Sequence, residues 1–426
     1  MRRMKANTMR LDPSLEQLQT MHLLGDRVSA LWNAANYACR QGFFVGEKIP
    51  SYHSLCCAFQ DHDAYRALPS DVAQEVLKVL REAWSSYFAL RVLWKAGKLK
   101  DKPGLPKYRK DRKTGKRLTD WIPLKCDRAY RVESRTVSVT LPRDLRGAGR
   151  LVLSYWGIRR YHGAGRRAVI CYDKARGRWY FRYSVDVPDN AIKPWPGVAG
   201  IDLGIRVLVS LSIAGVETAF HFLGREVLKD WMYWTRKIAE HQRELAHRNK
   251  KTSRRLKRLY AMRRCRLQHA WDAMARRVVK VCKRYKVGKV VIGWPKGILD
   301  DSHLSRKWNG LTHGFWSFEQ VSQRLMLALR RAGIVPERVG ERGTSSHCPR
   351  CESPRVVRRP RHLLRCRDCE LHVHSDQAGS FNMMRQKYPV FWDGAEAAPA
   401  PETHRFNQHR WADAHNPSIQ VEDLAA

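Results

Sequence analysis

The sequence predicts an α+β protein with several domains, and three observations lead to this prediction. Apolar residues recur at helical spacing up to about residue 98, whereas residues 120–190 alternate between apolar and polar side chains as strands do. In the last part, strand-like and helical segments alternate around two Cys-x2-Cys pairs. A chain of 426 residues has room for about three domains.

The amino-terminal elements can be placed from local signals. A short basic strand is expected at 2–11, and Ser14 and Gln17 have the spacing of a capping box, which predicts that a helix begins there. Apolar spacing then indicates helices that pack into a core. Further on, the turn at 173–177 precedes alternating residues at 179–187, which predicts a β-hairpin within a small sheet or barrel.

The chain is strongly basic, with 80 Lys and Arg against 40 Asp and Glu and a formal net charge of +40. A field of this sign attracts polyanions, so nucleic acid is the expected partner. Residues 98–117 are expected to form a solvated loop, and the helical stretch 226–284 a rod along a nucleic-acid backbone rather than only a solvated face. The candidate contacts are Lys107, Arg109, Arg236, Lys237, Arg243, Lys250, Lys251, Arg254 and Arg255.

A membrane is the competing partner for a basic chain. However, the sequence has no uncharged apolar stretch of about 18 residues, and its start lacks the apolar core of a secretory signal. We therefore expect a soluble, intracellular protein with no membrane partner.

The last region places an acidic residue inside an apolar strand. Asp202 lies within Gly-Ile-Asp-Leu-Gly-Ile at 200–205, and a second strand is expected at 207–212, a hairpin typical of the opening of an RNase H-like sheet. The segments expected to follow are a strand at 290–292, a helix at 317–332 and a strand at 334–339.

Four cysteines are expected to bind zinc. Cys348, Cys351, Cys366 and Cys369 form two Cys-x2-Cys turns, and four thiolates suit one tetrahedral Zn²⁺. The neighbouring histidines (His347, His372 and His374) could substitute as ligands but are expected to be bystanders. The chain has 11 cysteines, and those outside this motif show no paired spacing, as expected of reduced thiols.

Three motifs together resemble a known family. Asp202 in its apolar strand, Thr344-Ser345 before the cysteines, and Asp376 followed by Ala378 and Asn382 are similar to the split RuvC nuclease of TnpB, a transposon-encoded RNA-guided nuclease, and of compact type V CRISPR effectors. The resemblance implies a helical recognition lobe, a small β-barrel wedge domain and an RNase H-like (RuvC) α/β domain with an inserted zinc finger. It also implies a guide RNA and target double-stranded DNA as partners, in the cytoplasm of a prokaryotic cell, associated with the nucleoid on DNA.

The resemblance also sets expected domain boundaries. They are 1–20 for the first wedge strand, 21–118 for the recognition domain, 119–192 for the wedge barrel, 193–343 for the RuvC-like domain, 344–370 for the zinc finger, 371–390 for the final RuvC-like segment and 391–426 for a disordered tail.

A nuclease of this family is expected to hold two Mg²⁺ or Mn²⁺ ions with three acids. Asp202 and Asp376 are two candidates; the alternatives are a buried strand residue and a helix N-cap. The usual glutamate after the middle strand is missing, since the chain has Gly293-Trp294 there. Some relatives take a glutamate from just before the zinc finger, which makes Glu341 the third candidate.

Other roles for these residues stay open. Glu341 could instead be a surface residue paired with Arg338 or Arg342, and Asp300, Asp301 and Glu337 are weaker substitutes for the third acid. The expected function is an RNA-guided DNA endonuclease. The gap at Gly293 leaves a nuclease-deficient RNA-guided DNA-binding protein as an alternative, and RNase H-like folds also serve RNA-independent transposases and integrases.

Overall fold

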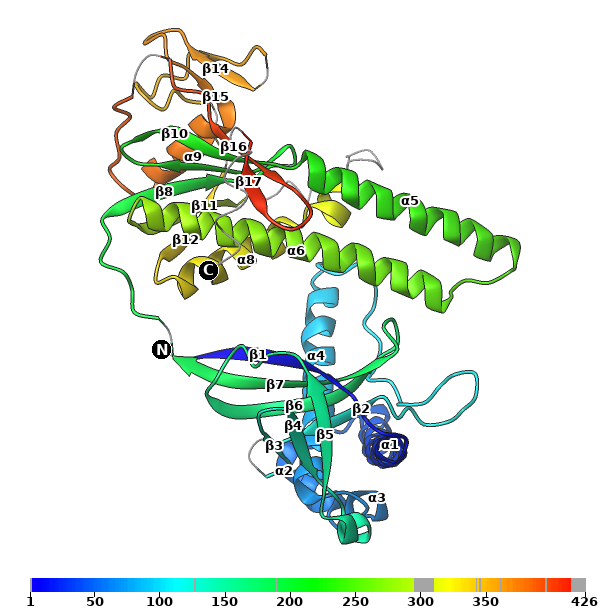
Figure 1. Ribbon diagram of the computed structural model, residues 1–426. Helices are drawn as coiled ribbons and strands as arrows, with labels where there is room; N and C mark the ends of the chain where they lie inside the picture. Colours follow the sequence, from blue (N-terminus) through cyan, green and yellow to red (C-terminus); the bar gives the residue numbers. More distant parts are fainter. Residues whose placement is uncertain are drawn as a thin grey trace. The chain divides into compact units, whose positions relative to one another are not determined.

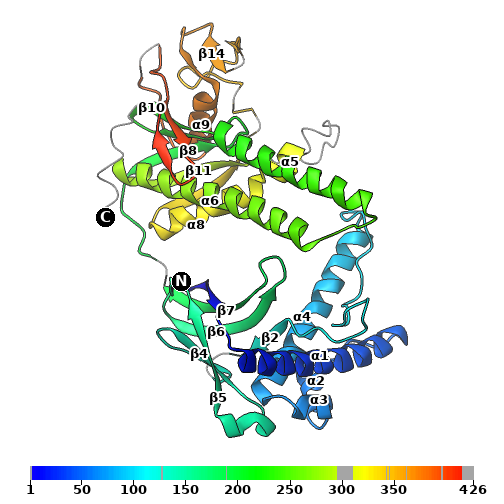
Figure 2. The same ribbon diagram turned by 45° about the vertical axis from the view of Figure 1, so that its right-hand side comes forward.

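The chain folds into two compact units, Met1–Pro188 and Asp189–Ala426, in a computed structural model. The structure describes residues 2–125, 128–188, 190–294, 310–341, 343–344, 346–360, 362–394 and 397–414. Figures 1 and 2 show each unit from two directions.

The first unit begins with the predicted strand, and the predicted helical region follows as four helices. Ser14 caps α1, because its hydroxyl accepts from the Gln17 amide while the Gln17 side chain accepts from the Ser14 amide, which confirms the capping box. The elements are β1 (Arg2–Leu11), α1 (Leu15–Phe44), α2 (Tyr52–Phe59), α3 (Asp63–Arg66) and α4 (Ser70–Lys95).

A seven-stranded antiparallel sheet completes this unit, in the order β2-β6-β7-β1-β5-β4-β3. The hydroxyl of Tyr130 on β3, at one end of this order, donates to the carbonyl of Arg166 on β6, next to the other end, over 2.6 Å, so the sheet curves back on itself. The remaining elements are β2 (Trp121–Leu124), β3 (Tyr130–Val132), β4 (Thr136–Thr140), η1 (Arg143–Ala148), β5 (Arg150–Trp156), β6 (Ala164–Asp173) and β7 (Arg178–Pro188).

The second unit is built on a mixed sheet in the order β12-β11-β8-β9-β10-β16-β17. β8, β9 and β10 are antiparallel, whereas β11 runs parallel to β8 and β12 parallel to β11. The carboxyl ends of β8, β11 and β12 therefore meet at one edge of the sheet. Its strands are β8 (Gly197–Asp202), β9 (Val207–Ile213), β10 (Val216–Leu223), β11 (Val287–Trp294), β12 (Val335–Gly340), β16 (Glu402–Phe406) and β17 (Trp411–Asp413).

The prediction of a disordered tail at 391–426 was wrong for its central part. β16 pairs in parallel with β10, and β17 closes a hairpin in which Trp411 is buried. The Ala/Pro-rich composition before residue 402 concealed this hairpin. An open sheet edge offers unpaired backbone groups, which these strands satisfy.

The basic stretch forms a helical hairpin rather than one rod. The helices α5 (Arg225–His247) and α6 (Arg254–Arg284) run side by side in opposite directions (Figures 1 and 2) and bury Ile238, Leu245 and Leu256 between them. Asn249 reverses the chain in a left-handed conformation with a φ of 50°. Within the described part of the chain, no helix is long and apolar enough to cross a membrane.

Smaller elements carry the cysteines and the last acidic motif. A three-stranded sheet holds the cysteine region, and a short helix follows it directly. These elements are η2 (Gly310–Phe315), α8 (Phe318–Arg331), β13 (Val356–Val357), β14 (Leu363–Cys366), β15 (His372–His374) and α9 (Ser375–Arg385).

Candidate catalytic and metal sites

Two of the predicted acids lie at the shared edge of the second sheet. Asp202 is the last residue of β8, and Glu341 directly follows the last residue of β12. β11 lies between these strands, with Ile292 beside Ile201 and Gly293 beside Val339. Parallel pairing therefore brings together two acids that are 139 positions apart in the printed sequence.

The third predicted acid reaches this edge through close packing of α9 on β8. A Cβ atom on Gly200 would lie only 1.9 Å from the main-chain oxygen of Ser380, and one on Gly379 would lie 3.1 Å from Oδ2 of Asp202. Only glycines permit this approach, which places Asp376 in the first turn of α9 near Asp202. The N-cap of α9 is His374, whose Nδ1 accepts from the Asp376 amide, so Asp376 is not the cap.

The three carboxylates influence one another electrostatically. Burial, followed by the charge of Asp376, raises the pKa of Asp202 to about 7, against an opposing hydrogen bond from the Leu203 amide. Burial, followed by the charge of Asp202, raises the pKa of Glu341 to about 8. Without a cation, the site therefore holds protons that exposed carboxylates would lose at neutral pH.

Glu341 occupies the space that a side chain on the middle strand would need. A Cβ atom on Gly293 would lie 2.7 Å from Oε1 of Glu341 and 2.5 Å from the sulfur of Met383. Arg338, expected as its surface partner, instead pairs with Glu319 at 3.2 Å. The Glu341 carboxylate thus turns inward, to the position left open by the glycine.

The donor atoms of this site suit a hard divalent cation. All three side chains offer carboxylate oxygens, and Oε1 of Glu341 is buried without a hydrogen-bond partner among the described residues. The carboxylate oxygens of the three acids do not all lie within 4.8 Å of one another. By the chemistry of their donor atoms, these residues fit Mg²⁺ or Mn²⁺.

The weaker candidates for the third acid do not join this group. Glu337 on β12 accepts a hydrogen bond of 2.6 Å from the Tyr388 hydroxyl. Asp300 and Asp301 lie outside the described residues, as do Arg342 and Ser345.

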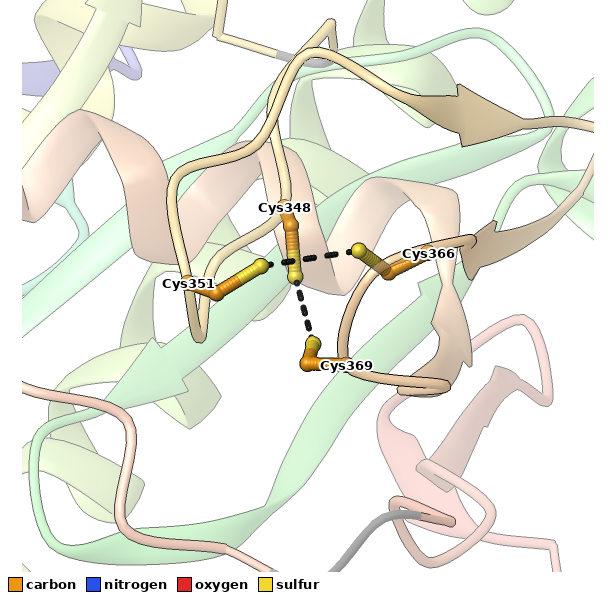
Figure 3. Close-up of side chains that lie close together, drawn as sticks. All are labelled: Cys348, Cys351, Cys366 and Cys369. Atoms are coloured by element: carbon orange, nitrogen blue, oxygen red, sulfur yellow. Dashed lines mark hydrogen bonds between the residues drawn. The ribbon is translucent and has the colours of Figure 1, made fainter.

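The four predicted cysteines converge, as Figure 3 shows, with all four Sγ atoms within 4.8 Å of one another. Sγ atoms of Cys348 and Cys369, and of Cys351 and Cys366, are 3.5 Å apart. A disulfide would need about 2.05 Å, whereas thiolates about 2.3 Å from a tetrahedral zinc lie at roughly this separation. The cluster therefore fits one Zn²⁺.

α9 connects the cysteine region to the sheet edge where Asp202, Glu341 and Asp376 lie, which we call the acidic edge. The side-chain amide of Asn382 donates to the carbonyls of Thr344 and His347, over 2.7 and 2.9 Å. The hydroxyl of Thr344 donates to the carbonyl of Glu341 over 2.9 Å. The loop that carries Glu341 is thus fixed by the same helix that carries Asp376.

Most of the predicted nucleic-acid contacts are exposed, but Arg109 is not on a solvated loop as predicted. Its guanidinium pairs with Asp120 at 2.7 Å and lies 4.7 Å from the Trp121 ring. Burial lowers the pKa of Arg109, while Asp120 opposes this effect. Arg109 therefore has a structural role. The exposed candidates are Lys107, Arg236, Lys237, Arg243, Lys250, Lys251, Arg254 and Arg255.

A further group of metal-binding residue types was missed because it lies in the tail. Ligand atoms of Glu402, His404 and Asp413 lie within 4.8 Å of one another. Asp413 also pairs with Arg277 of α6 at 2.8 Å. Since His404 and Asp413 are opposite each other on β16 and β17, this network anchors the hairpin on α6.

Comparisons with known proteins agree on one family. Residues 180–299 match a family model for OrfB of IS605, described as a probable transposase, and residues 318–383 match the Cas12f1-like TNB domain. The TnpB-like protein ORF457 of Acidianus two-tailed virus is 27% identical over 91% of this chain and 87% of its own length. A solved complex of Cas12f1 with single-guide RNA and target DNA is 12% identical, with a TM-score of 0.55 over 90% of this chain and 99% of that chain. This last match shows the α+β fold.

Proposed function

Because the chain belongs to the family of TnpB proteins and compact type V CRISPR effectors, we propose that it is an RNA-guided DNA endonuclease with a RuvC-like site. The observation that carries this proposal is the convergence of Asp202, Glu341 and Asp376 at one sheet edge. The strand order β10-β9-β8-β11-β12, three antiparallel strands followed by two parallel ones, supports an RNase H-like domain.

The proposed partners are a guide RNA and a target double-stranded DNA. The solved Cas12f1 with a related fold is bound to a single-guide RNA and target DNA. The net charge of +40 supports binding of polyanions of this size. In such proteins, base pairing with the RNA selects the sequence, and the protein reads duplex shape and a short adjacent motif.

The proposed division of labour follows the two units. The curved sheet and helices of residues 1–188 correspond to the wedge and recognition parts, and the mixed sheet to the RuvC-like part with its zinc finger at 344–370. We add the hairpin 402–413 to the RuvC-like part, because it extends the same sheet.

In the proposed site, Asp202, Glu341 and Asp376 would hold two Mg²⁺ ions. Bound divalent ions supply Lewis acidity and a water of lowered pKa for phosphodiester hydrolysis. Asp202 and Glu341 provide buried oxygens whose pKa values are raised by burial and by a neighbouring acid, and a bound cation would offset the cost of ionising them. Asn382 and Thr344 hold the Glu341 loop in position.

The position of Glu341 favours an active enzyme over a nuclease-deficient relative. That alternative was motivated by the glycine after the middle strand, and Glu341 places a carboxylate beside this glycine. The proposed site would therefore have three acids in spite of the unusual sequence.

Cleavage by the purified ribonucleoprotein tests the proposal. The RNA that copurifies is sequenced, and a plasmid carrying the matching target beside a randomised flanking motif is incubated with Mg²⁺. We expect Asp202→Asn, Glu341→Gln and Asp376→Asn each to reduce cleavage by at least about 10²-fold while target binding persists. Glu337→Gln, on the strand that precedes Glu341, is the control. Intact DNA with the unmodified protein, or full cleavage by Glu341→Gln, contradicts the proposal.

A further inference from the structure

A basic cavity of about 730 Å³ lies in the first unit between α1 and the segment 106–118. Five cations line it, and no described lining residue is acidic; the cations are Arg40, Lys107, Arg109, Lys110 and Arg112. Trp32 and Tyr108 add aromatic surface. This combination differs from an ordinary basic surface, where carboxylates are interspersed.

The cavity wall is held rigidly, although its sequence predicted a solvated loop. Trp32 donates from its indole nitrogen to the carbonyl of Lys107 over 3.0 Å, and Asn36 donates to the carbonyl of Pro106 over 3.0 Å. The amide of Arg109 donates to Oδ1 of Asn33 over 2.7 Å. These donors and acceptors repeat along one face of α1, so the segment is ordered before any ligand arrives.

The charges in the cavity are only partly used within the protein. Arg109 is paired with Asp120, whereas the structure gives Lys110 and Arg112, both exposed, no carboxylate partner among the described residues. The Arg40 guanidinium lies 4.6 Å from the Tyr108 ring, and its Nε is buried without an acceptor. Unpaired cations beside a stacked arginine and tyrosine suit an anion attached to a flat ring.

We propose that this cavity holds a single unpaired nucleotide of the bound nucleic acid, with its phosphate against Lys110 and Arg112 and its base against Arg40 and Tyr108. Cations position the phosphate, and planar side chains stack on a base of any identity. The proposal builds on the proposed function, which supplies both an RNA and a DNA strand. Inorganic phosphate alone would not use the aromatic surface of the cavity.

Binding of short single-stranded oligonucleotides to the full-length, RNA-free protein tests this site. The test variant is Lys110→Ala/Arg112→Ala. The matched control is Lys98→Ala/Lys113→Ala. It removes the same charge from two exposed residues that are near the cavity in the sequence but do not line it. Fluorescence anisotropy over a range of salt concentrations gives Kd and its salt dependence, and thermal melting verifies that each variant is folded.

We expect the test variant to bind about 10-fold more weakly than the control, and the slope of log Kd against log salt concentration to become shallower by about one. Photo-crosslinking with 4-thiouridine RNA and 4-thiothymidine DNA, read by mass spectrometry, should modify residues 107–112. Modification by only one oligonucleotide identifies the strand that supplies the nucleotide. Equal Kd values for the two variants, or crosslinks elsewhere with both oligonucleotides, would overturn the proposal. Because no cleavage is measured, failure here is separate from failure of the nuclease proposal.

Discussion

At the scale of single residues, the carboxylate of Glu341 lies beside the glycine of the neighbouring strand. Gly293 and Glu341 lie at the ends of adjacent parallel strands, and Oε1 of Glu341 lies where a side chain at 293 would begin. The glycine is therefore not merely a missing acid. Its lack of a side chain leaves room for the glutamate.

This arrangement predicts that the carboxylate can be moved by mutation from Glu341 to position 293 on the neighbouring strand. Gly293→Glu alone should impair cleavage, because the new side chain meets the Glu341 carboxylate and Met383. Glu341→Gly alone should abolish cleavage, and Gly293→Glu/Glu341→Gly should recover at least about 10-fold over it. A Gly293→Gln/Glu341→Gly control separates the charge from the volume. If the two double variants are equally inactive, the two positions do not serve the same site.

The raised pKa values predict how stability depends on pH. The folded-state pKa values of about 7 for Asp202 and about 8 for Glu341 lie above their unfolded values near 4. The folded protein therefore binds more protons, and without divalent metal its stability should fall by several kcal/mol as pH rises from about 4 to 8. Mg²⁺ should raise the melting temperature strongly at pH 8.5 and little at pH 5.5.

Thermal melting in EDTA and in Mg²⁺ across this pH range provides the measurement. In Asp202→Asn/Glu341→Gln the pH dependence and the Mg²⁺ effect should both shrink. A melting temperature that rises with pH in EDTA would contradict the assigned directions.

At the scale of elements, local signals in the sequence were enough wherever neighbouring residues decide the conformation. Ser14 and Gln17 predicted the start of α1, and the spacing of the cysteines predicted their convergence. The turn between α5 and α6 could not be predicted, because no glycine or proline marks it and Asn249 takes the left-handed conformation. The inward position of Arg109 depends on Asp120 and Trp121, which only the tertiary fold brings beside it.

The contact between α9 and β8 gives a prediction at this scale. Gly200→Ala should destabilise the protein by about 1–3 kcal/mol and reduce cleavage, since its Cβ would collide with the Ser380 main chain and push Asp376 away from Asp202. Gly104→Ala is the control, because its Cβ meets no atom within 4 Å. Urea unfolding and plasmid cleavage are measured for both. Similar stability of the two variants would show that α9 can shift without cost.

At the scale of the whole molecule, composition predicted the class of partner but not the extent of the fold. Disorder was predicted from a run of alanine and proline, and the prediction wrongly included the residues after this run. Those residues form strands because they pair with the edge of β10, which the local composition does not indicate. His404 and Trp411 are buried there against Phe222. Phe222 is more than 180 positions away in the sequence, so no local pattern near residue 402 indicates this contact.

The hairpin should therefore contribute to global stability. Trp411→Ala removes a buried ring and the hydrogen bond from its indole nitrogen to the Ala270 carbonyl, at 3.0 Å, and should cost about 3–5 kcal/mol. Phe391→Ala, at a residue that is 76% exposed, is the control from the same tail. The midpoint of urea unfolding is measured for both variants and should fall for Trp411→Ala only. Unchanged stability for Trp411→Ala would mean that the hairpin is not part of the core.

The glycine at the end of β11 also bears on how relatives are sorted. Surveys that look for an acid at that one alignment column would file this chain among the inactive members, although a carboxylate is present a strand away. In this chain the end of the neighbouring strand carries a carboxylate beside the position where the usual acid is missing. Apparent losses of the motif elsewhere merit inspection of the neighbouring strand before such proteins are counted as dead.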